Sequence, residues 1–274
     1  MIKIIDIDEL FDKYISDFVY QNIGKIKPEE IENQIPKLYE EFGDKKLKEL
    51  DGFSPNTYYL NFDISDLIKC LKSHINEGVS VSDFLCEAIT KNKENELALV
   101  DALDDKDEEF TLYIMNMLAD MGSKRCSAKF LEFILWDYST PIKELATEHL
   151  KGMANDVKDQ ILSQFNDLDE SVKEYLSEIL SMCEKEDKIF DILIKQFVKN
   201  PSKIPIYAGY LSKYGDQRAL PFLMTQIERE DITYADFEEL RFAIEVLGGE
   251  YNKIRDFNKD KTYKKIKAKA KEKH

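Results

Sequence analysis

The clearest alternation of apolar and polar positions lies in residues 214–249, where two apolar stripes at helical spacing are separated by a short polar segment. The first stripe consists of Ala219, Leu220, Leu223, Met224 and Ile227. The second stripe consists of Phe237, Leu240, Ile244 and Leu247. Steps of three and four residues place each stripe on one face of an α-helix. The segment therefore predicts two antiparallel helices joined by a turn at residues 228–232.

The ends of this helical pair carry their own signals. Asp216 follows a glycine and opens the first helix. Thr233 and Asp236 form a T-x-x-D capping box, in which each side chain accepts a backbone hydrogen bond at the start of the second helix. Two glycines at 248–249 supply a left-handed stop. Because one such pair cannot bury its apolar face alone, the pattern predicts neighbouring pairs.

Similar pairs recur upstream with a period of about 30 residues. The turns within the pairs fall near Gly78, Asp105, Tyr138, Asp167, Asn200 and Asp231. First helices are predicted near residues 65–76, 95–103, 125–136, 156–166, 187–199 and 218–229, and second helices near 81–91, 108–121, 141–153, 170–183, 203–214 and 234–248. Pro205 and Gly209 weaken the pattern in one second helix.

Two internal matches support the repeat. Residues 79–84 (VSVSDF) match residues 232–237 (ITYADF), which predicts a second capping box formed by Ser80 and Asp83. Residues 121–140 match residues 214–233 in their glycine, arginine and apolar positions.

The first 62 residues do not follow the repeat. Apolar spacing predicts a helix at residues 6–20 and a second helix opened by Pro28, with a kink or break near Gln34 caused by Pro36. Ser54 followed by Pro55 predicts the start of a short helix that holds two tyrosines against the body. We interpret this block as a helical cap over the end of a repeat stack.

The run G-D-x-R-A-L-P-x-L at residues 215–223, followed by a second capped helix, resembles HEAT repeats, in particular the short bacterial type first associated with phycobilisome lyases. The resemblance covers residues 63–249. It implies an all-α fold, a right-handed α-α superhelix (HEAT-like α-solenoid) whose second helices line a concave face. It also implies that Asp216 and Arg218 form hydrogen bonds between repeats. Proteins with such repeats bind proteins, assist cofactor attachment or act as enzymes, so function must be argued from the site.

We therefore divide the chain into a helical N-terminal cap (residues 1–62), about six HEAT-like helical pairs (residues 63–249) and a basic tail (residues 250–274). Only 10 glycines and 7 prolines in 274 residues argue against a sandwich or barrel with many turns. The net charge of -15 is unevenly distributed, because residues 253–274 carry +7 and the preceding 252 residues carry -22. Such a body repels a phosphate backbone, so nucleic acid is an unlikely partner.

The sequence gives no indication of export or membrane insertion. Its start is acidic and lacks the apolar core of a secretory signal, and no run approaches the roughly 18 apolar residues of a membrane helix. Four cysteines without paired spacing predict reduced thiols. We expect a cytoplasmic, bacterial protein.

Motifs for catalysis, cofactors or metals are lacking. The chain has no glycine-rich phosphate loop, C-x-x-C, H-E-x-x-H or calcium loop. HEAT-like deoxyhypusine hydroxylases hold iron through His-Glu pairs, whereas here only the reversed pair Glu148-His149 occurs. Cys70, His74 and Glu77 could share one helix face as metal ligands, but a buried thiol beside a polar residue at the core boundary is the favoured interpretation. We predict no cofactor, no metal and no catalytic residue.

Two further candidates for chemistry have structural explanations. Cys86 lies on an apolar helix and is expected to pack. Alkylpurine DNA glycosylases, which also use HEAT-like repeats, place a Trp, an Asp and an Arg at the concave face. Trp136 and Asp137, with Arg125 or Arg241, are the matching residues here, but a structural tryptophan is the favoured interpretation.

Acidic and tyrosine residues on the predicted second helices form the candidate partner site. Its residues are Glu144, Glu148, Glu174, Glu178, Tyr207, Tyr210, Tyr214, Glu238, Arg241 and Glu245. An acidic groove with tyrosine anchors suits a basic peptide or protein, since charge raises the encounter rate and aromatic burial supplies affinity. The alternative interpretation is a solvated acidic face that maintains solubility.

The lysines of the tail have no sustained apolar stripe, which predicts a mobile segment rather than a packed helix. One hypothesis is that the tail folds into the acidic groove and competes with a partner; the other is a disordered solubility tail. The predicted function is a non-catalytic scaffold or adaptor that binds a basic peptide or protein. The runner-up is an enzyme or enzyme accessory resembling a DNA glycosylase or a chromophore lyase. The sequence does not determine the oligomeric state, and we favour a monomer.

Overall fold

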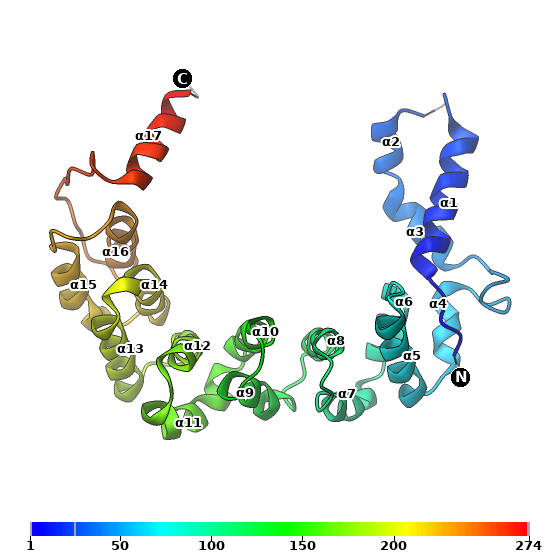
Figure 1. Cartoon of the computed structure of the whole chain (residues 1–274), viewed down its shortest axis with the longest axis horizontal. Helices are drawn as coiled ribbons and strands as arrows, with labels where there is room; N and C mark the ends of the chain where they lie inside the picture. The colour runs from blue at the N-terminus through cyan, green and yellow to red at the C-terminus, as the bar shows by residue number, and fades with distance from the viewer. Residues whose placement is uncertain (1, 25, 273–274) are drawn as a thin grey trace. The chain divides into compact units, whose positions relative to one another are not determined.

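The computed structural model describes residues 2–24 and 26–272, and within these residues the secondary structure is helical, without a β-strand (Figure 1). The protein is therefore all-α. The chain divides into two compact units, Met1–Lys129 and Phe130–His274. Each unit is built of helices that pack against their neighbours in sequence. No helix among the described residues is long and apolar enough to cross a membrane.

Unit 1 begins with α1 (Ile7–Asn22), α2 (Pro28–Glu32), α3 (Ile35–Gly43) and α4 (Pro55–Tyr58), followed by the 3-10 turn η1 (Tyr59–Asn61). The break between α2 and α3 confirms the kink predicted near Gln34, because Pro36 occupies the first turn of α3. Phe11 of α1 packs 4.9 Å from Tyr39 and 5.2 Å from Phe42 of α3, measured between ring centroids. These rings form the core of the N-terminal block.

Two helical pairs complete unit 1. They are α5 (Ile64–Glu77) with α6 (Asp83–Thr90), and α7 (Glu96–Ala102) with α8 (Glu108–Asp120). The prediction of a capping box at Ser80 and Asp83 is wrong. The helix begins at Asp83 with Ser82 as its N-cap, and the Ser80 hydroxyl instead donates to the Asp8 carboxylate. The extended residues before α6 place Ser80 too far from the helix start to cap it.

Unit 2 contains α10 (Thr140–Lys151), α11 (Ala154–Gln164), α12 (Glu170–Leu180), α13 (Asp187–Lys199), α14 (Ile204–Tyr214), α15 (Leu220–Ile227), α16 (Tyr234–Val246) and α17 (Lys261–Glu272), preceded by most of α9 (Ser127–Leu135). With α5–α8 of unit 1, the helices α9–α16 account for all twelve helices that the apolar spacing predicts between residues 63 and 249. The capping box of Thr233 and Asp236 is confirmed, as is the left-handed stop, since Gly248 has a φ of 82°.

The helices of unit 2 form two layers. The second helices of the pairs, α10, α12, α14 and α16, contact one another in that order, and we call them the second-helix layer. The first helices cover one side of it, with α11 on α12, α13 on α14 and α15 on α16. In the first pair, Phe130 of α9 lies 5.6 Å from the His149 ring of α10, measured between ring centroids. The apolar core lies between the two layers.

Polar ties join the last two pairs. The Arg218 guanidinium donates to Asp187 at 2.7 Å and to Asp216 at 2.8 Å, and it stacks 4.3 Å over the Phe190 ring. The hydrogen bond from Arg218 lowers the pKa of Asp216 below its ordinary value. The expected hydrogen bonding between repeats through Asp216 and Arg218 is thus present, because Asp187 and Phe190 belong to the preceding pair.

The C-terminal segment differs from the prediction of a mobile, unpacked tail. Residues 250–260, which we call the C-terminal strap, pack along the last pair. Arg255 Nη1 donates to the Ile227 carbonyl at 2.7 Å, and Lys253 Nζ lies 2.5 Å from a Glu228 carboxylate oxygen. The Phe257 ring lies 5.1 Å from that of Phe237. The strap therefore covers apolar surface that a further repeat would otherwise bury, and α17 follows it as a helix.

Candidate functional site

The three tyrosines proposed as partner anchors lie in the core. Tyr207, Tyr210 and Tyr214 are only 1%, 8% and 3% exposed. The reason is the position of α14, which contacts α12, α13 and α16 and has little free surface. The Tyr210 hydroxyl donates to Glu178 at 3.3 Å, and burial raises the pKa of Tyr207 to about 12. The proposed anchoring role is therefore corrected: these rings join helices within unit 2 and offer no face to a partner.

Most of the proposed glutamates are exposed or half-buried on the second-helix layer, but several are already paired. Lys151 lies 2.5 Å from Glu148 and 3.0 Å from Glu178. Lys203 pairs with Glu174. The hydrogen bond from Lys151 lowers the pKa of Glu148. Positive charge from neighbouring turns thus neutralises part of the acidic surface that the sequence predicts.

Two carboxylates on this layer have no ion-pair partner among the described residues. Glu144 of α10 and Glu239 of α16 are exposed, and neither has an ion-pair partner among the residues that the structure describes. They are therefore available to a positively charged partner.

The layer also exposes apolar side chains that the sequence analysis missed. Met182 after α12 is 47% exposed, and Ile206 at the start of α14 is 38% exposed. Phe242 and Val246, one turn apart on α16, are 57% and 51% exposed. A signal for the last two was present, because both lie outside the apolar stripe of their helix. Such side chains are candidates for partner contacts.

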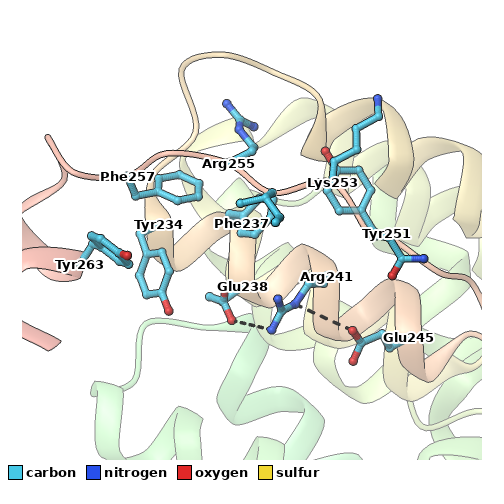
Figure 2. Close-up of a pocket in the computed structure, with 12 residues that line it drawn as sticks. Tyr234, Phe237, Glu238, Arg241, Glu245, Tyr251, Lys253, Arg255, Phe257 and Tyr263 are labelled. Atoms are coloured by element: carbon cyan, nitrogen blue, oxygen red, sulfur yellow. Dashed lines mark hydrogen bonds and ion pairs between the residues drawn. The ribbon is translucent and has the colours of Figure 1, made fainter. Parts of the chain in front are cut away.

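Charged groups surround the exposed apolar pair on α16. Arg241 Nη2 lies 3.1 Å from Glu238, and Arg241 Nε lies 3.8 Å from Glu245 (Figure 2). Glu238, Glu239, Arg241, Phe242 and Glu245 line a shallow depression of about 380 Å³. We call the surface formed by Glu238, Glu239, Phe242, Glu245 and Val246 the α16 face. It is apolar at its centre and carries a net negative charge.

A second cavity, of about 420 Å³, lies between α16, the C-terminal strap and the start of α17 (Figure 2). We call it the aromatic cavity, and its walls include Tyr234, Phe237, Tyr251, Phe257 and Tyr263. The Tyr234 ring lies 5.0 Å from Tyr263 and 5.4 Å from Phe257, measured between ring centroids. Glu238, Arg241 and Glu245 also line the cavity from α16, and Lys253 and Arg255 line it from the strap.

The structure thus brings three of the predicted site residues, Glu238, Arg241 and Glu245, to one cavity. The other wall comes from the strap, which the sequence analysis did not include in the site. A signal existed there too, because Tyr251, Lys253, Arg255 and Phe257 alternate along an extended segment. Alternate residues of an extended chain share one side.

The aromatic cavity combines ring faces with charged side chains. Ring faces attract cations, and the Arg255 guanidinium already lies 5.6 Å over the Phe257 ring and 5.9 Å over the Phe237 ring. The Glu238 and Glu245 carboxylates pair with Arg241. Burial raises the pKa of Tyr234 and Tyr251, so both phenols stay protonated at neutral pH. The lining also contains three cations, Arg241, Lys253 and Arg255, against the carboxylates of Glu238 and Glu245, so its charge gives no preference for a further positive group.

The environment of Trp136 corrects another expectation. Its side chain is 66% exposed in the turn after α9, so it is not a structural tryptophan. Asp137 beside it is also exposed. Tyr138 packs there instead, with its ring 4.6 Å from that of Phe133. Arg241, one of the arginines considered for a glycosylase-like site, is engaged by Glu238.

The surroundings of the cysteines and of His74 explain why these residues do not form a metal site or a nucleophile. His74 is buried, with Nδ1 2.9 Å from the Cys70 carbonyl and Nε2 3.3 Å from the Ile5 carbonyl. Within residues 2–24 and 26–272, no three His, Cys, Asp or Glu side chains are grouped for a metal ion. Burial raises the pKa of Cys86 to about 12, and that of Cys70 to about 11. Such thiols are poor nucleophiles at neutral pH.

The fold and the site together define an all-α protein with an acidic, partly apolar helix surface and an aromatic cavity at the C-terminal end of unit 2. No protein-family model and no curated protein sequence matches the chain. Its function therefore has to be argued from this surface.

Proposed function

We propose that the chain is a non-catalytic scaffold or adaptor of the HEAT-like α-solenoid type, whose second-helix layer in unit 2 binds a basic segment of a partner protein. The observation that carries the proposal is the α16 face, where Phe242 and Val246 are exposed among glutamates. Exposed aromatic and aliphatic side chains inside a charged rim are typical of protein interaction sites.

The solenoid part of the proposal is supported by local packing. Successive second helices of unit 2 contact each other more extensively than successive first helices do. In a curved stack of helical pairs, the more closely packed layer lies on the inner side. Hydrogen bonds between successive pairs, as at Arg218, are also expected of such repeats. We infer a right-handed superhelix with the second helices on its concave side.

The basic character of the partner follows from charge. The second-helix layer carries more glutamates than lysines, and Glu144 and Glu239 lack ion-pair partners in the described part of the chain. A lysine or arginine of a partner would gain attraction from these carboxylates without displacing an internal ion pair.

A peptide-binding experiment tests the proposal. Labelled peptides that combine lysines with one large apolar residue should bind the full chain, whereas their Lys→Glu counterparts should not, and added salt should weaken binding. Phe242→Ala should weaken binding by about tenfold, the loss expected for a central apolar contact. Phe222→Ala is the matched control, because Phe222 is 39% exposed on the first helix α15.

Two results would contradict the proposal. Binding that is indifferent to peptide charge would remove the role of the glutamates. An equal effect of Phe222→Ala and Phe242→Ala would show that the second-helix layer is not the binding surface. The acidic face would then serve solubility alone.

An enzyme or enzyme accessory on the same scaffold remains the second candidate, and the exposure of Trp136 beside Asp137 is the observation that favours it. A glycosylase-like activity would release alkylated bases from DNA and would be lost in Trp136→Ala. A chromophore-lyase-like activity would require a chromophore-bearing partner. The charge of -22 on residues 1–252 weighs against the DNA substrate.

A further inference from the structure

Helix α17 is the most basic element of an acidic protein. Its five described lysine side chains, Lys261, Lys264, Lys265, Lys267 and Lys269, are all exposed. None of the five forms an ion pair with a described carboxylate, whereas Lys151, Lys158, Lys199 and Lys203 of unit 2 do so. Among the described residues, no carboxylate therefore compensates the positive charge of α17.

The first turn of α17 is fixed to the body, and Lys267 farther along the helix donates to the Asn258 side chain of the strap at 3.5 Å. The Asp260 carboxylate accepts hydrogen bonds from the Thr262 and Tyr263 amides at 2.8 and 3.0 Å and from the Tyr234 amide at 3.2 Å. It thus joins the starts of α16 and α17. The Tyr263 ring packs 5.0 Å from that of Tyr234. Beyond this turn, Ile266 is 50% exposed.

The arrangement of side chains on α17 gives it one apolar line within a basic surface. At 100° per residue, Ile266 lies between Lys267 on one side and Lys269 on the other. This pattern is complementary to the α16 face, where Phe242 and Val246 lie between Glu239 on one side and Glu238 and Glu245 on the other. Both surfaces belong to the same end of unit 2.

We propose that α17 of one copy docks on the α16 face of a second copy, and that the second copy reciprocates across a two-fold axis. Ile266 packs against Phe242 and Val246, while Lys267 and Lys269 meet the glutamates at either edge. The inference rests on the proposed function, since it names a second copy of this chain as the partner of that surface. It departs from the monomer favoured on sequence grounds.

The two-fold arrangement follows from the location of the two surfaces. Because donor helix and acceptor face lie on one end of the chain, a single rotation forms both contacts and closes the assembly. The twelve residues of α17 span about 18 Å, which is long enough to cover the exposed part of α16. Two contacts of this size lie at the small end of specific interfaces, so the dimer should be salt-sensitive.

Sedimentation equilibrium of the full chain tests the dimer. At low salt the molar mass should rise with concentration from 32.0 kDa to twice that value, and high salt should return it to 32.0 kDa. A mass of 32.0 kDa at every concentration and salt level would overturn the proposal.

Charge exchange tests the named contacts. Two double variants are made: one combines Glu238→Lys with Glu239→Lys, and the other combines Lys267→Glu with Lys269→Glu. Neither variant should form a dimer with itself, because like charges then face each other. An equimolar mixture of the two variants should recover it, since each contact of the mixed dimer is again complementary. Lys188→Glu with Lys195→Glu on α13, both exposed, is the matched control and should leave dimerisation unchanged. Circular dichroism verifies that each variant is folded.

The experiment with the mixed variants shows whether α17 of a second copy occupies the α16 face. Failure of the mixture to dimerise would overturn the α17–α16 contact even if the wild type dimerises. Binding of the wild-type chain to anionic vesicles or duplex DNA through α17, at a constant mass of 32.0 kDa, would also overturn it.

An additional peptide-binding experiment distinguishes failure of this inference from failure of the proposed function. A lysine-rich peptide unrelated to α17 is added to the Lys267→Glu, Lys269→Glu chain, whose α16 face is unoccupied under the proposal. If the peptide binds and the wild type does not dimerise, only the inference fails. If neither occurs, both fail.

Discussion

Asp216 lies where the chain passes from one helical pair to the next, and it performs two tasks there. Its carboxylate caps the short 3-10 turn η5 (Gln217–Ala219) through the Arg218 amide at 2.9 Å, and it holds the Arg218 guanidinium that reaches Asp187. Asp216 is 8% exposed, so removing it leaves donors without a partner at a buried position.

Asp216→Ala should therefore lower the free energy of unfolding by about 1–2 kcal/mol, as measured by urea denaturation. Asp231→Ala is the matched control, because the Asp231–Arg229 pair is exposed and lies within one turn. It should have no measurable effect. Equal losses in the two variants would show that Asp216 acts only as a surface charge.

The thiols offer a second prediction at the scale of single residues. Burial raises the pKa of Cys86 to about 12 and that of Cys183 to about 11, while an unfolded thiol has a pKa of about 8.5. At pH 8 all four cysteines of the native chain should react with Ellman's reagent far more slowly than in urea. One thiol reacting at the unfolded rate would identify an open site that the structure does not contain.

The sign of the pH effect at high pH follows from the same burial. A thiol whose pKa is raised on folding contributes stability that is present below the unfolded pKa and is lost as pH rises towards the folded pKa. The free energy of unfolding should thus decrease between about pH 8.5 and pH 11. Stability that rises over this range would contradict the burial of Cys70, Cys86 and Cys183.

At the scale of helices, the two T/S-x-x-D patterns make a matched pair. Thr233 caps α16 in the structure, whereas Ser80 does not cap α6. Thr233→Ala should cost about 1 kcal/mol of stability, the usual value for an N-cap. Ser80→Ala should cost less than about 0.5 kcal/mol, as for most surface substitutions. Similar losses would indicate that both residues act as caps.

The strap provides a further test at this scale. Phe257 contacts Phe237 and Tyr234, while Ile254 three residues earlier is 99% exposed. Phe257→Ala should lower the free energy of unfolding by about 2 kcal/mol, since a half-buried ring loses part of the value of a full one. It should also increase hydrogen exchange in residues 250–263. Ile254→Ala should change neither quantity, and a tail that is mobile in solution would make the two variants indistinguishable.

At the scale of the whole molecule, acid should destabilise the fold. Hydrogen bonds from lysine or arginine side chains lower the pKa of Asp105, Glu148 and Asp216. A carboxyl whose pKa is lowered on folding contributes stability above its unfolded pKa of about 4 and loses it as pH falls through the folded value. The urea midpoint should therefore be constant near neutral pH and fall below about pH 4. A midpoint that rises on acidification would contradict these ion pairs.

The twelve helices between residues 63 and 249 could be predicted because their cause is local. Apolar steps of three and four residues, proline in first turns and glycine after last turns act within one helix, and each is visible in the sequence. The break near Gln34 belongs to the same class, since Pro36 restricts its own neighbourhood. Where a local pattern occurred twice, as at Ser80 and Thr233, the sequence could not decide in which copy the Ser or Thr is the N-cap of the helix that follows.

The candidate site was harder to predict because exposure is decided by neighbours. Helical spacing places Tyr207, Tyr210 and Tyr214 on α14, but contacts with α12, α13 and α16 bury them. The prediction for Trp136 was wrong in the opposite sense. This large apolar residue was expected to pack in the core, but it lies in an exposed turn. Glutamate charge was visible in sequence, whereas its neutralisation by Lys151 and Lys203 depends on residues about one repeat away.

By itself, the sequence determined the all-helical class, the paired helices and the separation of an acidic body from a basic end, because these depend on composition and on spacing within single helices. Only the tertiary structure decided which side chains face solvent and that the strap covers the last pair. It also decided that the lysines of α17, which follows α16 at the same end of the chain, have no carboxylate partner among the described residues. Those properties arise from packing between segments distant in sequence. An apolar stripe indicates that its helix face must be buried, but it does not identify the segment that buries it.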